Sequence, residues 1–432
     1  MNQPHHPNPR WLSRRGLLQG AAAAAATVAW PRLGHTAELE KNAAGQDAAA
    51  RRALDRAVEY LWSQQADDGG WHSPQYGVLR SGQALTPFVL HSLLGAIDVL
   101  NCFDEGKIRR ASGFITSHLD SAGVLGQFDP DLIEYPVYCS SYALQAFARF
   151  QSFGQKLGAD ADAAAKSMSN FLLAAQFDED DGFTSADAAY GGWGFQAALK
   201  PGQSGHMDLA HTRRALDALA LPQFEKQSVE ARTKAQTFLR VVQKLPQAAA
   251  RPQVAAPNHA TLAPPPSSDR PESAMDSTPF DGGFYFSPVV LEANKGRQED
   301  EPTPHWRSYA TATCDGILAL LAAGVRPEDE RVTAAVAWLQ SHTDLDYPQG
   351  VPTEHPEPWG EAIRFYHYAV RAEVYQRLGW PADERLRLAT AVSAKQDPDG
   401  SFVNRESALM KEDDPVMCTA LAVVALSNCL GE

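Results

Sequence analysis

Hydrophobic residues recur with the period of an α-helix along most of the chain. Apolar side chains at positions i, i+3, i+4 and i+7 line one face of a helix, and the stretches 54–61, 235–242 and 332–339 all follow this spacing. The rest of each helical turn is polar or charged. A helix with one apolar and one charged face lies on the outside of a packed domain, so we expect these stretches to form outer helices.

A second kind of segment alternates with the first and is apolar almost all round. A helix without a polar face belongs in the interior. Six such segments predict inner helices at 83–100, 138–150, 208–221, 309–324, 365–378 and 417–430. Six outer helices alternating with six inner ones predict an all-α fold, a closed (α/α)6 toroid whose inner helices line a central cavity. Closure removes the exposed ends that an open repeat array must cap.

The inner segments share a hydroxyl residue just before their apolar run. Five of the six have one, and these are Thr86, Ser141, Thr212, Thr313 and Thr419. Such a hydroxyl caps a helix or bonds to the carbonyl four residues earlier. We expect one of these structural roles at all five positions.

A short phrase marks the turn after several outer helices. It reads LWSQQADDGGW at 61–71, AAQFDEDDGF at 174–183 and SAKQDPDGSF at 393–402, and FDGGFYF at 280–286 is a copy without the glutamine. A phrase that returns in this way indicates an internal repeat. The stretch 246–279 is rich in Pro, Ala and Ser, which cannot build a core, and is interpreted as an insertion that leaves the repeat.

The turn phrase resembles the glutamine–tryptophan repeat of squalene cyclases and related terpene cyclases, which protein prenyltransferase β subunits also contain. The resemblance covers most of residues 50–430 and implies the α/α toroid. It also implies that the glutamine bonds to backbone groups at a helix end. For function it implies a hydrophobic, isoprenoid-like ligand in the cavity and isomerase-type chemistry. The residues that carry it are Gln65–Gly69–Trp71 and Gln396–Gly400–Phe402, with Gln176 and Gly182–Phe183 as a looser copy.

Residues 1–37 are expected to be a targeting segment, and residues 38–432 the toroid. Arg14 and Arg15 stand before the small apolar run Ala21–Ala26, an order that resembles a twin-arginine export signal. This predicts export to the periplasm or the extracellular space. No later stretch reaches the roughly 18 uninterrupted apolar residues of a membrane span, so none is expected after the signal.

Charge and cysteine content narrow the partners. The formal net charge of −14 argues against binding to nucleic acid. Five cysteines is an odd number, and all but one lie in apolar helical patterns, so no disulfide framework is expected. The partner that remains is a hydrophobic small molecule.

The resemblance to class II terpene cyclases implies a particular acid. Those enzymes protonate an alkene or epoxide with the middle aspartate of a D-x-D-D-T pattern at the cavity end of an inner helix. The matching segment here is DLAHT, Asp208–Thr212, in which Ala210 replaces the acid and cannot donate a proton. A literal D-x-D-D pattern, with glutamate at its second position, occurs at 178–181. It lies in the outer turn phrase, however, and is interpreted as a solvated acidic turn.

The resemblance to prenyltransferases implies a zinc site instead, built from an Asp-x-Cys pair and a distant histidine. His367 in FYHYA is similar to the histidine element, but Ala312 stands where the aspartate before Cys314 is needed. Two imperfect ligands do not make a tetrahedral zinc site. No metal and no cofactor are therefore expected.

Aromatic and titratable residues gather before the inner segments, as they do at ligand sites. Asp208 and His211 are the candidate catalytic pair, because a spacing of three places them on one helical face. A carboxylate beside an imidazole should hold a proton near neutrality. The candidate ligand-binding residues are Arg80, Trp193, Phe195, His206, Tyr309, Tyr366 and His367.

Three functions fit these observations. The first is a toroid that binds or transforms an isoprenoid-like ligand, and the second is a non-catalytic binding or scaffold toroid, which Ala210 favours. The third is a carbohydrate-active toroid with Asp208 and Glu361 as acid and base. A deep apolar cavity favours a lipid, whereas an open groove with paired carboxylates favours a sugar.

Overall fold

The computed structural model describes residues 33–127, 132, 134–201, 206–245, 280–290, 293–298 and 305–431. The chain divides into the units Met1–Asn42 and Ala43–Glu432, and the architecture below is that of the second unit. Residues 1–32 of the expected export signal and the expected insertion 246–279 lie outside the described ranges. Helix α1 (Leu33–Ser63) begins within the expected signal and continues into the second unit.

The described chain contains two sets of long helices in alternation. The outer set is α1, α4 (Glu105–Ser117), α6 (Ala159–Ala174), α8 (Val229–Val242), α11 (Glu330–Ser341) and α14 (Ala382–Ser393). The inner set is α3 (Leu85–Leu100), α5 (Pro136–Ser152), α7 (Leu209–Leu219), α10 (Ala310–Ala322), α13 (Arg364–Arg377) and α15 (Pro415–Leu430).

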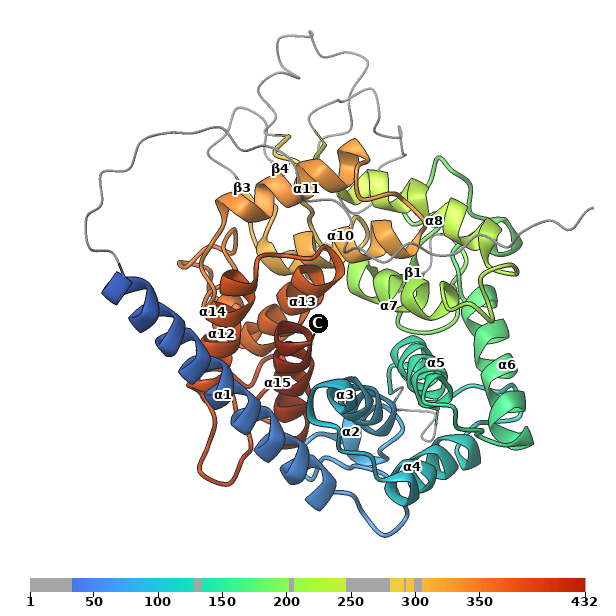
Figure 1. Ribbon diagram of the computed structural model, residues 1–432. Coiled ribbons are helices and arrows are strands. Elements are labelled where there is room, and N and C mark those ends of the chain that lie inside the picture. The colour runs from blue at the N-terminus through green and yellow to red at the C-terminus, as the bar shows by residue number, and fades with distance from the viewer. Residues whose placement is uncertain are drawn as a thin grey trace, which may run out of the picture. The chain divides into compact units, whose positions relative to one another are not determined.

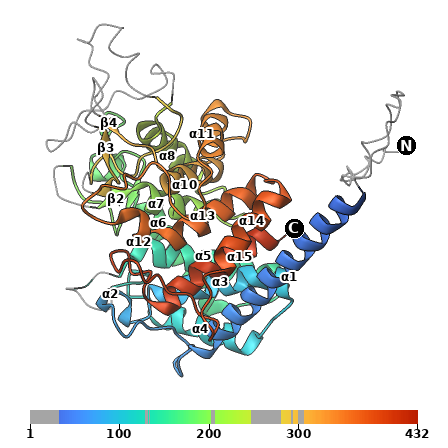
Figure 2. The same ribbon diagram turned by 90° about the vertical axis from the view of Figure 1, so that its left-hand side faces the viewer.

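Short elements connect these helices. They are α2 (Gly77–Arg80), α12 (Trp359–Ala362), the 3₁₀ turn η1 (Glu179–Asp181), and the strands β1 (Trp193–Gly194), β2 (Met207–Asp208), β3 (Arg297–Gln298) and β4 (His305–Trp306). The strands form two antiparallel pairs, β1 with β2 and β3 with β4. Turned on its side, the structure shows β2, β3, β4, α2 and α12 on one side of the helical layers (Figure 2).

The inner helices form a closed ring. Each packs on the next in the order α3, α5, α7, α10, α13, α15, and α15 packs back on α3. The outer helices surround this ring (Figure 1). The predicted all-α (α/α)6 toroid is therefore confirmed. In the described part of the chain, no helix has both the length and the hydropathy of a membrane span.

Burial follows the two hydrophobic patterns. Helix α10 buries twelve of its thirteen residues, because neighbours cover it on every side. Helix α11 buries only Val332, Ala335, Trp338 and Leu339, a single stripe that faces α10. The five cysteines are all unpaired thiols, and each except Cys102 is buried in this core.

Four glutamines join the repeats to one another. Each side-chain amide nitrogen donates to the carbonyl of a turn glycine and to a carbonyl of the next outer helix, at 2.7–3.1 Å. The last of them bonds to α1 and so closes the outer ring. The glutamines with their two acceptors are Gln65 with Gly69 and Lys107, Gln176 with Gly191 and Ala231, Gln243 with Gly282 and Arg331, and Gln396 with Gly400 and Ala53.

Two of these junctions differ from the sequence expectation. Gln176 pairs with Gly191 and Trp193 rather than with Gly182–Phe183. The indole Nε1 of Trp193 donates to Leu172 O at 2.6 Å, as that of Trp71 donates to Leu61 O at 2.7 Å. The copy at 280–286 does not lack its glutamine either, because Gln243 supplies it from 39 residues before Gly282. In both cases an insertion between glutamine and glycine conceals the phrase.

The shared hydroxyls also have a different role from the expected one. Four of them accept a hydrogen bond from the backbone N–H of the junction's aromatic residue, at 2.9–3.1 Å. Only Thr212 makes the expected bond to the carbonyl four residues earlier, that of Asp208. Ser141 Oγ has no hydrogen-bond partner among the described residues. The four pairs are Thr86 with Trp71, Thr212 with Trp193, Thr313 with Phe284, and Thr419 with Phe402.

Candidate functional site

A cavity of about 210 Å³ lies at the centre of the inner ring. All the inner helices contribute to its wall, which is mostly aliphatic and aromatic. The polar exceptions matter for function. They are five tyrosines, Thr311 and four ionisable side chains, namely Lys295, Asp315, Lys411 and Glu412.

Asp315 is the acidic group of α10 that faces the cavity. It is 1% exposed, and its two carboxyl oxygens lie 3.0 and 2.9 Å from the hydroxyl of Tyr366, which donates to them. Burial raises the pKa of Asp315 to about 7, although Arg213 and Arg214 oppose this shift. The group is therefore a carboxylic acid that still holds its proton just below neutral pH.

A buried ion-pair cluster beside Asp315 explains why those arginines do not ionise it. Arg213 contacts Asp217 at 2.7 Å and Glu373 of α13 at 2.8 Å, and Arg214 contacts Glu373 at 3.2 Å. Burial opposes ionisation of Glu373, but the two arginines outweigh it and hold its pKa at about 2. The two cations already have two carboxylates as partners, and their charge lowers the pKa of Asp315 by less than burial raises it.

Glu412 is the second carboxyl group on the cavity wall. Its oxygens accept hydrogen bonds from the backbone N–H groups of Phe365 and Tyr366, at 2.9 and 2.8 Å, and from the amide of Asn404 at 2.9 Å. These bonds cap the start of α13. Burial nevertheless raises the pKa of Glu412 to about 7. Tyr366 thus links both carboxyl groups, Glu412 through its backbone and Asp315 through its hydroxyl.

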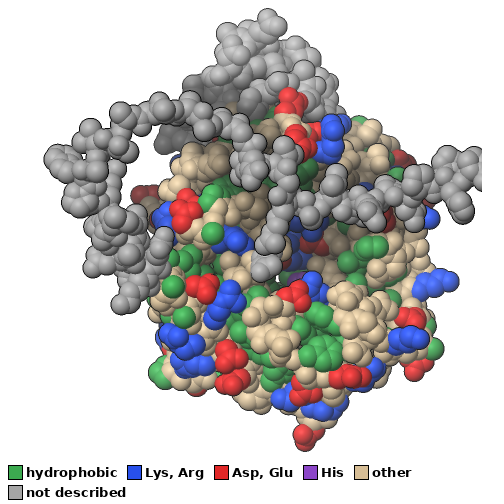
Figure 3. Space-filling view, in the orientation of Figure 1, with side chains coloured by type: hydrophobic (Ala, Val, Ile, Leu, Met, Phe, Trp, Pro, Cys, Tyr) green, Lys and Arg blue, Asp and Glu red, His purple; other side chains and the backbone are tan. Residues whose placement is uncertain are grey.

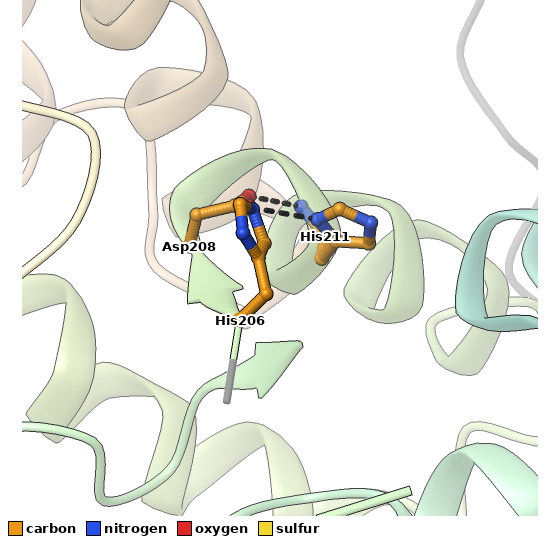
Figure 4. Close-up of side chains that lie close together, drawn as sticks. All are labelled: His206, Asp208 and His211. Atoms are coloured by element: carbon orange, nitrogen blue, oxygen red, sulfur yellow. Dashed lines mark hydrogen bonds and ion pairs between the residues drawn. The ribbon is translucent and has the colours of Figure 1, made fainter. Parts of the chain in front are cut away.

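The predicted pair Asp208 and His211 does come together, and His206 joins it (Figure 4). Asp208 Oδ1 caps α7 by accepting from the backbone N–H of His211 at 2.9 Å. Asp208 Oδ2 lies 2.7 Å from His206 Nε2 and 2.8 Å from His211 Nδ1. Burial would raise the pKa of Asp208, but the two imidazoles hold it well below its usual value. Burial opposes protonation of His206, but the hydrogen bond to Asp208 and the charge of that carboxylate together outweigh it and raise the pKa of His206.

This cluster lies behind the cavity wall rather than in it. Ala210, which stands between Asp208 and His211, lines the cavity, whereas those two residues do not. The methyl group therefore occupies the position at which the resemblance implies an acid. A catalytic role for Asp208 and His211 stays a prediction.

Among the described residues, His206, Asp208 and His211 are the one set of three that could hold a metal ion, with ligand atoms within 4.8 Å of one another. Two imidazoles and a carboxylate suit a divalent transition metal. Asp208 Oδ2 already bonds to a ring nitrogen of each histidine, and the positive charge of Lys295 acts on both His206 and Asp208. The buried His211 Nε2 has no hydrogen-bond partner among the described residues, but no second ligand atom of the set adjoins it. We therefore assign no metal here. No such set includes Cys314 and His367 in the described chain.

The other predicted ligand-binding residues divide into two groups. Tyr309 and Tyr366 line the cavity. Arg80 is exposed, and Trp193 is fixed in a repeat junction. The ring of Phe195 packs between Tyr135 and His211, with centroids 4.4 and 5.3 Å away.

His367 lies outside the cavity wall and is fully buried. Its Nε2 is 3.4 Å from the carbonyl of Asp344. Burial lowers the pKa of His367 to about 3, so the ring is neutral. His367 is therefore a core histidine that contacts the Asp344 carbonyl, and it does not reach the cavity.

Sequence reasoning missed all four ionisable groups of the cavity, Lys295, Asp315, Lys411 and Glu412. Asp315 had a usable signal, because it is the single charged residue in the apolar segment 309–324. An ionisable side chain inside a helix that is buried all round is a candidate for function. Lys295 and Glu412 lie in connecting segments, where no periodicity indicates which side chains turn inward.

No family model matches the chain, and no curated protein matches it in sequence. The solved structures that are similar to it include a variant of the type II terpene cyclase MstE from Scytonema in complex with its substrate geranylgeranyl dihydroxybenzoate. The TM-score is 0.48 at 15% identity, over 89% of this chain and 98% of that one. A protein from Actinoplanes gives 0.47 at 15% identity, over 88% and 99%. TM-scores below 0.5 carry no argument about ligand or reaction.

Proposed function

We propose that the toroid binds a hydrophobic, isoprenoid-like ligand in its central cavity and that Asp315 donates a proton to it. The observation that carries this proposal is the cavity wall itself. It combines aliphatic and aromatic side chains with a buried carboxyl group that burial keeps protonated up to about pH 7. The resemblance of the turn phrase to the cyclase repeat supports the same ligand class.

The surroundings of Asp315 suit proton transfer. When the proton leaves for a basic oxygen of the ligand, the carboxylate that remains keeps the hydrogen bond from Tyr366. The nearby Arg213 and Arg214 also favour the ionised form. A group with a pKa of about 7 is a moderate acid, adequate for an epoxide, alcohol or carbonyl oxygen but too weak for an isolated alkene. We therefore expect no cyclisation of squalene.

The two alternatives have less support. A carbohydrate site needs paired carboxylates in an open groove, and neither Asp208 nor Glu361 is part of the cavity wall. A purely structural scaffold does not require an uncompensated carboxyl group in an apolar cavity, where burial is costly.

Mass spectrometry of molecules that co-purify with the exported protein tests ligand binding. We expect prenyl compounds from the wild type and none from Ala210→Trp, which fills the cavity from its wall. The matched control is Ala163→Trp at an exposed position of the outer helix α6, which should retain the ligand. Recovery of sugars, or equal lipid recovery from the cavity-filled variant, would contradict the proposal.

The role of Asp315 needs its own comparison. Asp315→Asn keeps the shape and removes the proton, so it should retain ligand while product formation falls at least about 100-fold, as for loss of a general acid. Asp208→Asn is made for comparison, because Asp208 is a buried carboxylate that lies outside the cavity wall. Equal activity of wild type and Asp315→Asn would move the acid to another residue.

We further infer that the protein is exported through the twin-arginine signal at Arg14 and Arg15. The guanidinium pair rather than bulk charge is what such a signal presents. Replacing both with lysine should leave folded protein inside the cell. Normal export of that variant, measured by fractionation, would contradict the inference.

A further inference from the structure

Lys295 is a buried amine on the cavity wall. It is 5% exposed, and its Nζ donates to the carbonyl of Ala293 at 2.6 Å. The same nitrogen lies 4.7 Å from the ring centroid of Phe286 and 4.2 Å from that of Trp359. No described carboxylate lies within ion-pair distance of it, and the carboxylate that acts on it most, Asp208, already bonds to two histidines.

These contacts do not balance the charge. Burial lowers the pKa of Lys295 to about 8, so the amine is still mostly protonated at neutral pH. Removing an ammonium group from water costs more than one hydrogen bond and contact with two aromatic rings return. The positive charge of Lys295 on the cavity wall is therefore not neutralised by these contacts.

The rest of the wall does not supply that anion. Asp315 and Glu412 are the acidic side chains of the lining, and burial keeps both mostly neutral below about pH 7. On the face of the molecule drawn in Figure 3, by contrast, acidic and basic side chains are interspersed. Elsewhere, the partly exposed Lys395 pairs with Asp346 at 3.2 Å. Lys295 thus differs from Lys395, because no described carboxylate pairs with it.

We infer that Lys295 binds the anionic head of an amphiphilic ligand, specifically the carboxylate of a prenyl acid whose hydrocarbon chain fills the cavity. The inference rests on the proposed function of the cavity and adds the ligand's charge. The ring faces of Phe286 and Trp359 hold the ammonium group in place, and its remaining N–H donors are available to the carboxylate.

A single lysine favours a monoanion over a diphosphate. Diphosphate sites generally combine several cations, arginine forks or Mg²⁺. Of the wall's basic residues, Lys411 lies over the ring of Tyr135, 5.9 Å away, and is partly exposed. The buried amine of Lys295 is therefore the better match to one carboxylate.

Equilibrium dialysis of the full-length protein with three matched probes tests the inference. The probes are farnesoic acid, farnesol and farnesyl diphosphate, each below its micelle concentration. The wild type should bind the acid roughly tenfold or more tightly than the alcohol, as expected for one charge-assisted hydrogen bond. Lys295→Met should bind both equally, with its affinity for farnesol unchanged, and Lys295→Arg should keep a preference for the acid. Lys395→Met, which removes an ammonium group outside the cavity wall, is the control and should behave like the wild type. Lys411→Met tests the other lysine of the wall and should keep the preference for the acid.

The possible failures are distinct. Equal binding of acid and alcohol by the wild type, or loss of the preference in Lys411→Met alone, overturns the role of Lys295 and leaves the proposed function standing. A preference for the diphosphate overturns the carboxylate assignment. Failure of every probe to bind overturns the proposed function as well. Thermal unfolding of Lys295→Met should match the wild type or exceed it, because a buried charge is removed.

Discussion

The repeat junctions and the central cavity treat buried polar groups in opposite ways. At each described junction the glutamine amide donates to two carbonyls, and a threonine accepts from the adjacent aromatic residue. In the cavity, Glu412 accepts three hydrogen bonds. Among the described residues, however, Asp315 has the Tyr366 hydroxyl as its one hydrogen-bond partner, and Lys295 has no carboxylate partner. Satisfied polar groups specify a structure, whereas unsatisfied ones store the capacity to bind or react. Junction changes should therefore cost stability, and cavity changes should cost function.

The largest effect is expected at the first junction. Trp71 is fully buried, and Trp71→Ala should destabilise the protein by about 3–5 kcal/mol, since a large core side chain is lost. The neighbouring Trp62, with its ring 5.6 Å away, is only partly buried. Trp62→Ala is thus a matched control and should cost less than half as much. Chemical denaturation measures the free energy of unfolding of both variants. A loss below about 1 kcal/mol for Trp71→Ala would show that this junction contributes little to stability.

Glycine substitutions separate backbone strain from close packing at a junction. Gly191 has φ +83°, and an added Cβ would lie 2.1 Å from the carbonyl oxygen of Lys234. Gly324 has φ +88° but open space around its added Cβ. Gly324→Ala should cost about 1–2 kcal/mol from the left-handed backbone alone. Gly191→Ala should cost about 1–3 kcal/mol more, because the carbonyl must shift. Equal losses in denaturation midpoints would show that the junction tolerates a side chain.

These junctions also show how far the sequence could be interpreted. The alternation of two helix types predicted the ring correctly, because the period of burial is a property of each helix by itself. The junction of Gln176 with Gly191 and Trp193 could not be predicted, since Gln176 and Gly191 are 15 positions apart, whereas Gln65 and Gly69 are four positions apart. Cavity groups were harder still. Which loop side chains turn inward, as Lys295 does, depends on packing between repeats rather than on local pattern.

In the cavity, Asp315→Asn should change the pH dependence of stability more than stability itself. The pKa of Asp315 is about 7 in the folded protein, above its unfolded value of 3.8. Between these values unfolding releases a proton, so raising the pH favours unfolding by up to about 1.4 kcal/mol per pH unit. The wild type should therefore lose stability relative to Asp315→Asn from pH 4 to 7 and stay level outside this window. His91 and His367 have pKa values lowered by burial to about 3 and act in the opposite direction, but in both proteins alike.

A second variant sharpens this result. Glu373 raises the pKa of Asp315 through its negative charge, and it also pairs with Arg213 and Arg214. In Glu373→Gln this negative charge is lost and both arginines lose a carboxylate partner, so the pKa of Asp315 should fall. The pH range over which Asp315 lowers the stability should then end at a lower pH. If the difference in stability between the wild type and Asp315→Asn does not change with pH, Asp315 is ionised in the folded protein, and the proposed acid is wrong.

The smallest effect is expected where a junction is interrupted by the longest insertion. Gln243 and Phe284 form an isolated antiparallel bridge, and the backbone N–H groups of Lys244 and Gly282 donate to Gly283 O and Lys244 O at 2.8 and 2.6 Å. The chain therefore leaves and re-enters the repeat at one place. Deleting 250–276 should change stability by no more than about 1 kcal/mol, because loop closure changes by only about 0.6 kcal/mol for each doubling in length.

Gln243→Leu should instead cost about 1–3 kcal/mol by leaving Gly282 O and Arg331 O without their donor. That cost should be the same in the full chain and in the deletion. If the deletion alone lowers the free energy of unfolding by several kcal/mol, the insertion is a packed part of the domain. The bridge at Gln243 would then be insufficient to close this repeat.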